Sequence, residues 1–210
     1  MDEFIDVESL KSLDSYIRDG IKHHIESRAE DFFLNLHRLD AASPEKPGSR
    51  EIWLTRLKQG VPYNYLDLDK PDLWQPAAEA NKFSRLMDFI ETLPFKATGR
   101  MLIIYDDAMT TVPAHRDHLD PKICHEFIWF RTNLKKPFYV LNHQTDERLY
   151  VSSHSAWFDT VNQFHGSDAG EGLNFSIRVD GIFTDEFREN IPTSSSNPAS
   201  MPALWARLSG

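Results

Sequence analysis

The second half of the chain is divided into short segments of strand character, and this division most constrains the fold. From about residue 98 onward, β-branched and aromatic residues gather in short runs that are separated by turn-forming residues. Eight runs are predicted strands: 99–106, 110–116, 124–132, 136–141, 147–152, 155–160, 162–166 and 173–183. Eight short strands with regular turns are typical of a jelly roll or a small barrel, so we expect a mainly β domain.

The first part of the chain has helical periodicity instead. Apolar residues recur every three or four positions through the first 40 residues and again over about 76–92, which predicts helices in both places. Gly20 is a possible break or kink in the first of them. Residues 51–58 fit either a short strand or a turn of helix.

These patterns predict a single domain of residues 1–190. Residues 1–93 are expected to form a helical support region, and residues 98–186 are expected to form the β core. The Ser- and Pro-rich end of the chain, 191–210, is predicted to be an irregular tail.

Composition and charge narrow the class of protein. Hydrophobic residues make up 40% and charged residues 26% of the 210 residues, which is typical of a soluble globular protein. The net charge of −9 opposes binding to a phosphate backbone, so we expect no nucleic-acid partner. The single cysteine, Cys124, leaves no internal disulfide, and no apolar run suits a signal peptide or a membrane span. We expect a cytoplasmic protein with no membrane partner; the sequence does not indicate its oligomeric state.

Three residues form a candidate metal site. His115 and Asp117 lie two apart in "PAHRDHLD", and an extended backbone points such residues to the same face. His165 follows 50 residues later in "NQFHG", in the seventh predicted strand, whereas the His-x-Asp pair closes the second. The pair alone is a weak signal, and a solvent-facing turn is the alternative. Two imidazoles and one carboxylate together can hold a metal on one face and leave the opposite face open.

The eighth predicted strand has two distinct faces. Leu173, Phe175, Ile177 and Val179 alternate with Asn174, Ser176, Arg178 and Asp180. The polar face looks either into water or into a cavity. In a cavity, Arg178 is suited to grip a carboxylate through two hydrogen bonds, with the Ser176 hydroxyl beside it.

Several other residues are candidates for ligand contacts. Tyr105, ten residues before His115, offers its hydroxyl to a bound carboxylate, although core packing explains it equally well. In the third strand, Trp129 and Arg131 share one face. They predict a substrate pocket in which Arg131 holds a substrate carboxylate, with core packing as the alternative. His118 adjoins the motif as a substrate contact or a surface-loop residue.

Residues next to the metal ligands have a predicted supporting role. Asn162 and Gln163 directly precede His165, and they are candidates for orienting a ligand through hydrogen bonds.

This combination of residues resembles the pattern of the Fe(II)/2-oxoglutarate-dependent oxygenases. The residues that carry the resemblance are His115-x-Asp117, His165 and Arg178, which occur in that order on the eight predicted strands. The resemblance covers roughly residues 76–186, and it implies a double-stranded β-helix, a distorted jelly roll also seen in cupins, with preceding helices packed against it. It implies that the triad binds Fe(II) and that O2 is the oxidant. It also implies that Arg178, with Tyr105 and Ser176, binds the distal carboxylate of 2-oxoglutarate.

The chain departs from the family pattern at two positions near the co-substrate. Ala108 stands where a glycine often follows the tyrosine, and Ser176 precedes Arg178 where several subfamilies place the serine after the arginine. Asp117 is informative in its own right, because family members that halogenate replace this carboxylate with a small residue. The resemblance therefore implies hydroxylation.

The sequence leaves alternatives open for the substrate and for the class of activity. The resemblance implies attack on an unactivated C–H bond of a small polar substrate, such as an amino acid or an amino-acid-derived metabolite. A peptidyl side chain is the alternative substrate. A cupin-like metal protein without 2-oxoglutarate chemistry is a rival, although such sites favour three or four histidines and this chain has no His-x-His pair. A non-catalytic module that holds a small acid is a second rival.

Overall fold

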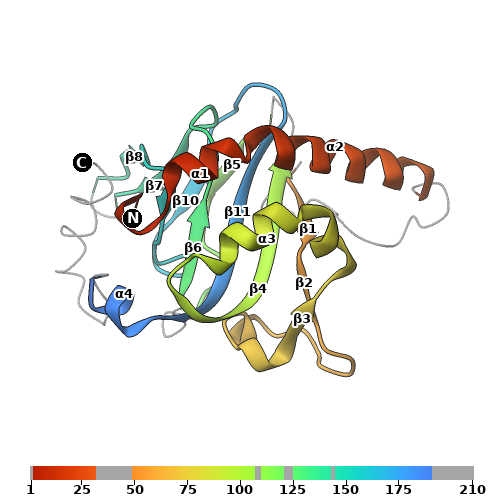
Figure 1. Ribbon diagram of the computed structural model, residues 1–210. Helices are drawn as coiled ribbons and strands as arrows, with labels where there is room; N and C mark the ends of the chain where they lie inside the picture. The colour runs from red at the N-terminus through yellow and green to blue at the C-terminus, as the bar shows by residue number, and fades with distance from the viewer. Residues whose placement is uncertain (1, 32–48, 107–109, 121–124, 143–144, 191–210) are drawn as a thin grey trace.

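The computed structural model describes residues 2–31, 49–106, 110–120, 125–142 and 145–190. Two antiparallel sheets form its centre (Figure 1). The large sheet has the order β1 (Arg50–Trp53), β4 (Phe95–Asp106), β11 (Asn174–Phe183), β6 (Phe127–Phe130) and β9 (Ser155–Ala156). The small sheet has the order β5 (Val112–His115), β10 (His165–Ser167), β7 (Phe138–Leu141) and β8 (Arg148–Tyr150).

The strand order confirms the predicted fold class. Each of the eight predicted strands is present, most of them shorter than predicted. The chain passes back and forth between the sheets, with β4, β6, β9 and β11 in the large sheet and β5, β7, β8 and β10 in the small one. Two facing sheets built by such alternation form a double-stranded β-helix.

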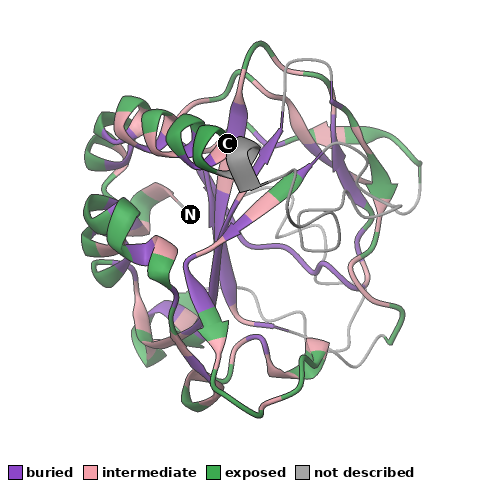
Figure 2. Ribbon diagram, turned by 90° about the vertical axis from the view of Figure 1, so that its right-hand side faces the viewer, coloured by how far each residue is buried: buried purple, intermediate pink, exposed green. Residues whose placement is uncertain are grey.

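The described helices α1 (Val7–Ser12), α2 (Asp14–Asp31) and α3 (Ser84–Glu91) cover one face of the large sheet. Figure 2 shows this sheet nearly edge-on, with helices on one side and the small sheet on the other. A short helix, α4 (Asp185–Asn190), follows β11. Fully buried residues such as Ile17 of α2, Leu86 of α3 and Ile177 of β11 belong to one hydrophobic core. Among the described helices, none is long and apolar enough to cross a membrane.

The predicted support region contains strands as well as helices. The ambiguous segment 51–58 forms β1, which extends the large sheet, and β2 (Thr55–Leu57), which pairs with β3 (Trp74–Pro76). The helix predicted over 76–92 begins as a 3-10 helix, η4 (Ala78–Phe83), before α3. The remaining 3-10 turns are η1 (Asp2–Phe4), η2 (Tyr65–Asp67) and η3 (Pro71–Leu73).

The expected break at Gly20 is wrong, because α2 continues through this residue. A Cβ atom at Gly20 would lie 2.6 Å from Cε1 of Phe83, so the glycine allows the fully buried Phe83 ring to approach the helix backbone. The break falls at Leu13, between α1 and α2. The end of the predicted first helix, 32–40, and the predicted tail, 191–210, lie outside the described residues.

Candidate metal centre

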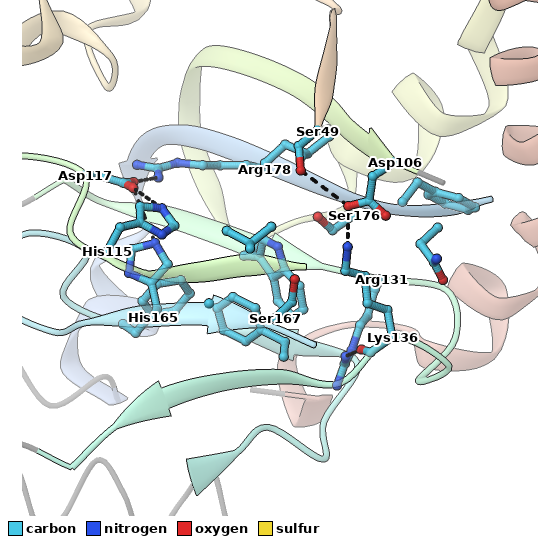
Figure 3. Close-up of a pocket in the computed structure, with 18 of the residues that line it drawn as sticks. Ser49, Asp106, His115, Asp117, Arg131, Lys136, His165, Ser167, Ser176 and Arg178 are labelled. Carbon is cyan, nitrogen blue, oxygen red and sulfur yellow. Dashed lines mark hydrogen bonds and ion pairs between the residues drawn. The ribbon is translucent and has the colours of Figure 1, made fainter. Parts of the chain in front are cut away.

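The three predicted ligands meet at one point. His115 ends β5, His165 begins β10, and the two residues are direct partners in the small sheet. Asp117 Oδ1 lies 3.5 Å from Nε2 of His115 and 3.3 Å from Nε2 of His165. One ligand atom from each residue lies within 4.8 Å of the other two. Figure 3 shows the three side chains converging at one end of a pocket.

Both imidazoles are oriented with Nε2 toward this point. The Nδ1 atom of His115 lies 2.9 Å from the Pro113 carbonyl, and that of His165 lies 3.1 Å from the Gln163 carbonyl. A carbonyl only accepts hydrogen bonds, so Nδ1 carries the proton and Nε2 keeps its lone pair, as a metal ligand requires. The buried Nε2 of His115 makes no hydrogen bond to the described residues. This donor set therefore fits a divalent transition metal.

A turn before β10 positions two of the ligands. The Asp159 carboxylate accepts hydrogen bonds from the backbone N–H groups of Val161 and Asn162, at 3.1 and 3.0 Å. Within this turn, the Thr160 carbonyl accepts from the backbone N–H of Asp117 at 2.8 Å. Gln163 was predicted to orient a ligand, and its backbone carbonyl contacts His165.

Arg178 contacts the candidate metal ligand Asp117 directly. Its Nη1 donates to Asp117 Oδ2 at 2.8 Å, while Nε and Nη2 donate to Asp180 Oδ1 at 3.0 and 2.9 Å. Arg100 Nε donates to the other oxygen of Asp180 at 2.9 Å. Burial opposes the charge of Arg178, but Asp180 and Asp117 outweigh it and raise the arginine pKa above its ordinary value. Burial also disfavours the Asp180 charge, but Arg100 and Arg178 lower the pKa of that carboxyl.

A pocket of about 830 Å³, its open mouth included, extends from the triad between the two sheets. Arg178 and Ser176 of β11 line it, and both Arg178 and Asn174 are nearly fully buried. The polar face of β11 therefore looks into a cavity rather than into water. Aromatic side chains from both sheets complete the wall: Phe127, Trp129, Phe138 and Phe158.

The far end of the pocket holds a lysine that sequence reasoning missed. The Lys136 ammonium contacts Oδ2 of Asp106 and donates to the Thr110 carbonyl at 3.0 Å. In Figure 3, Lys136 and Asp106 lie at the end of the pocket opposite the triad. Period-two spacing with Phe138, which also lines the pocket, was the available signal for Lys136.

The other predicted ligand contacts divide between the pocket and its surroundings. Tyr105 is buried in the hydrophobic core and does not line the pocket, whereas its neighbours Ile104 and Asp106 do. Trp129 and Arg131 both line the pocket. The Arg131 guanidinium donates to backbone carbonyls, including that of Lys136 at 2.7 Å, and burial lowers its pKa to about 10.

His118 does not line the pocket and belongs to an aromatic cluster. Its ring stacks on Tyr65 of η2 at 5.0 Å, and the Tyr65 ring meets the edge of His125 at 4.9 Å. Burial and the nearby charge of Asp117 raise the pKa of Tyr65. Sequence reasoning did not find Tyr65, because nothing local links its loop to the triad.

Comparisons with known proteins return only structural likeness. No protein-family model matches the chain, and no curated protein matches its sequence. A prolyl-4-hydroxylase from Pseudomonas putida is similar in structure, with a TM-score of 0.46 and 9% identity over 84% of this chain and 87% of its own.

Two further prolyl hydroxylases are similar at a lower level. The enzyme from Trichoplax adhaerens has a TM-score of 0.38 and 10% identity over 71% of this chain and 69% of its own. A viral collagen prolyl hydroxylase from Paramecium Bursaria Chlorella virus-1 has a TM-score of 0.37 and 8% identity over 84% and 91%. Similarity at this level leaves the function to be argued from the site itself.

Proposed function

We propose that this protein is a non-haem Fe(II)- and 2-oxoglutarate-dependent dioxygenase. It hydroxylates an unactivated C–H bond of a small polar substrate, such as an amino acid or an amino-acid-derived metabolite. The observation that supports this best is the convergence of His115, Asp117 and His165 at the end of a pocket. Two imidazoles and one carboxylate are the ligand set of non-haem Fe(II) oxygenases, which leave open positions for co-substrate and oxygen.

The metal would be held by Nε2 of both histidines and by Oδ1 of Asp117. When bound, Fe(II) with 2-oxoglutarate and O2 supplies the oxidising power that no amino-acid side chain has. The chain itself orients the ligands: the Pro113 and Gln163 carbonyls fix the two imidazoles, and the 159–163 turn fixes Asp117. With substrate bound, the aromatic wall would limit the access of water to the reacting atoms.

For the co-substrate, we place the distal carboxylate of 2-oxoglutarate on Lys136. The family resemblance implied Arg178 for this role, but the described hydrogen bonds of Arg178 go to Asp117 and Asp180, next to the candidate metal ligands. Lys136 lies at the opposite end of the same pocket, which suits a co-substrate that chelates the metal through one end. Among the described residues, Asp106 and Thr110 take two of the three ammonium donors, and the third would bind the carboxylate.

The first test measures turnover of the co-substrate. Protein purified without oxygen and then given Fe(II), 2-oxoglutarate and air is expected to release succinate, slowly even without a substrate. Asp117→Ala is expected to abolish this release, because the metal loses its carboxylate ligand. Wild-type protein that releases no succinate and binds no Fe(II) would contradict the proposed function.

The second test separates Lys136 from its neighbour. Lys136→Met is expected to raise the KM for 2-oxoglutarate by about 10- to 100-fold, since a hydrogen bond to a charged group contributes about 1.5–3 kcal/mol. Lys135→Met is the matched control, because Lys135 is exposed and does not line the pocket. An unchanged KM in Lys136→Met would show that the distal carboxylate binds elsewhere.

A substrate screen then tests the substrate class. The pocket between the sheets has a volume of about 830 Å³, its open mouth included, and a pocket of this size suits a small molecule. Free amino acids and their derivatives are expected to increase succinate release above the uncoupled rate. Stimulation of succinate release by short peptides alone would show that the substrate is a peptidyl side chain.

A further inference from the structure

Asp117 is the end of a buried chain of four charged side chains. Arg178 bridges Asp117 and Asp180, and Arg100 contacts the far oxygen of Asp180. Asp180 is fully buried, while Arg178 and Arg100 are 6% and 7% exposed. Two positive and two negative charges balance within the chain. Of its members, only Asp117 belongs to the triad.

We propose that Asp180 is a positioning residue for the metal centre. It holds the Arg178 guanidinium against Oδ2 of Asp117, so that the carboxylate offers only Oδ1 to the metal. This inference rests on the proposed function for the identity of the metal, and it deepens that proposal by explaining how Asp117 would be limited to one metal-binding oxygen.

The geometry of Arg178 supports this role. Nε and Nη2 both donate to one oxygen of Asp180, which leaves Nη1 directed at Asp117. The guanidinium carbon also lies 4.1 Å from the centre of the Phe127 ring, which fixes the guanidinium from one face. Arg178 is therefore restrained on two sides before it contacts Asp117.

The two oxygens of Asp117 have different surroundings as a result. Oδ2 accepts the Arg178 hydrogen bond, whereas Oδ1 faces Nε2 of both histidines at 3.3 and 3.5 Å. A carboxylate with one oxygen occupied in this way is disposed to bind a metal through the other oxygen alone. Outer partners of metal ligands commonly orient them in this manner, and their loss weakens metal binding.

Asp180 also balances the positive charge beside Asp117. Without the Asp180 charge, the two buried guanidinium groups of Arg178 and Arg100 would face a neutral side chain. The excess positive charge beside Asp117 would then disfavour a bound metal cation. The proposed role therefore depends on the charge of Asp180 as well as on its shape.

The test is metal affinity, measured with Co(II) in the absence of co-substrate. Asp180→Asn keeps the shape of the side chain, and we expect it to weaken Co(II) binding about 10- to 100-fold. The visible Co(II) spectrum, which reports coordination number, is expected to change as well. Asp185→Asn is the matched control, because Asp185 is exposed and forms ion pairs with Lys96 and Arg188. This control is expected to bind like the wild type.

A second variant keeps the proposal testable if Asp180→Asn fails to fold. Arg178→Lys retains the positive charge but loses the forked donors that join Asp180 to Asp117. We expect it to weaken Co(II) binding and, at saturating metal, to leave the KM for 2-oxoglutarate unchanged. Lys136→Met is expected to bind Co(II) like the wild type and to have a raised KM for 2-oxoglutarate.

The outcomes separate the two proposals. Wild-type protein without Co(II) affinity would overturn both. Equal affinity of the wild type and folded Asp180→Asn would overturn the role of Asp180 alone. An Arg178→Lys variant with a raised KM for 2-oxoglutarate and normal metal affinity would show that the distal carboxylate of the co-substrate binds Arg178.

Discussion

At the scale of single residues, the candidate metal centre depends on a close approach between strands. Gly166 follows His165 in β10, and a Cβ atom there would lie 2.5 Å from the Val112 carbonyl and 2.6 Å from the Tyr139 hydroxyl. These atoms belong to the strands on either side of β10, so any side chain at this position would push the neighbours apart. Gly166 therefore allows the close strand packing in which His165 lies opposite His115.

We predict that Gly166→Ala destabilises the protein by about 1–3 kcal/mol, as overpacking typically does, and weakens metal binding. Urea unfolding and Co(II) titration measure the two effects. His165→Ala is the comparison, since it removes a candidate ligand without inserting an atom between strands, and it is expected to lose metal affinity. Wild-type stability and affinity in Gly166→Ala would contradict the prediction.

Single residues also show which features of the site could be predicted from the sequence and which could not. The triad was predictable, because residues two apart on a strand share a face and the strand order could be counted. The face of β4 on which Tyr105 lies was not predictable. Tyr105 follows the continuous apolar run "MLII", in which apolar and polar residues do not alternate. The partners of Arg178 and Lys136 depend on contacts between strands, which local patterns do not contain.

At the scale of elements, the first long helix is anchored to the loop that leads to Lys136. The Asp14 carboxylate, at the start of α2, accepts hydrogen bonds from the Thr132 hydroxyl and, at 2.7 Å, from the Asn133 amide. Arg18, one turn later, donates both to Asp14 and to the Leu173 carbonyl just before β11. The predicted packing of helices against the β core therefore has a polar component that no hydrophobic pattern indicated.

This anchor predicts a pH dependence of stability. Burial disfavours the Asp14 charge, but hydrogen bonds from Arg18, Thr132 and Asn133 outweigh it and lower the pKa of Asp14 below 3.8. A carboxyl group with a lowered folded-state pKa stabilises the protein above its unfolded pKa, and this stabilisation is lost as the pH falls through the folded value.

We therefore expect Asp14→Asn to be less stable than the wild type by about 1 kcal/mol at pH 7, and the difference to shrink below about pH 4. Urea unfolding followed by tryptophan fluorescence at several pH values measures it. Asp19→Asn, at an exposed position on the same helix, is the control and is expected to have little effect at any pH. A difference that stays constant across this pH range would exclude ionisation of Asp14 as its cause.

At the scale of the whole molecule, the candidate centre joins the two sheets. The histidines belong to the small sheet, whereas Arg178, which contacts Asp117, belongs to the large one. A metal held by the triad is thus linked through Asp117 to both layers of the β-helix. Metal binding is consequently expected to oppose unfolding of the domain as a whole and not only of the β5–β10 pair.

A ligand that binds only the folded state stabilises it in proportion to the logarithm of its concentration over Kd. Co(II) or Mn(II) at 100 times its Kd is expected to add about 2.7 kcal/mol, which corresponds to a rise in Tm of about 5–10 °C for a chain of this size. Calorimetry without oxygen measures this shift, and Asp117→Ala is expected to remove it. A similar rise in Asp117→Ala would mean that the metal binds at surface histidines, because only the triad needs Asp117 to hold the ion between the two sheets.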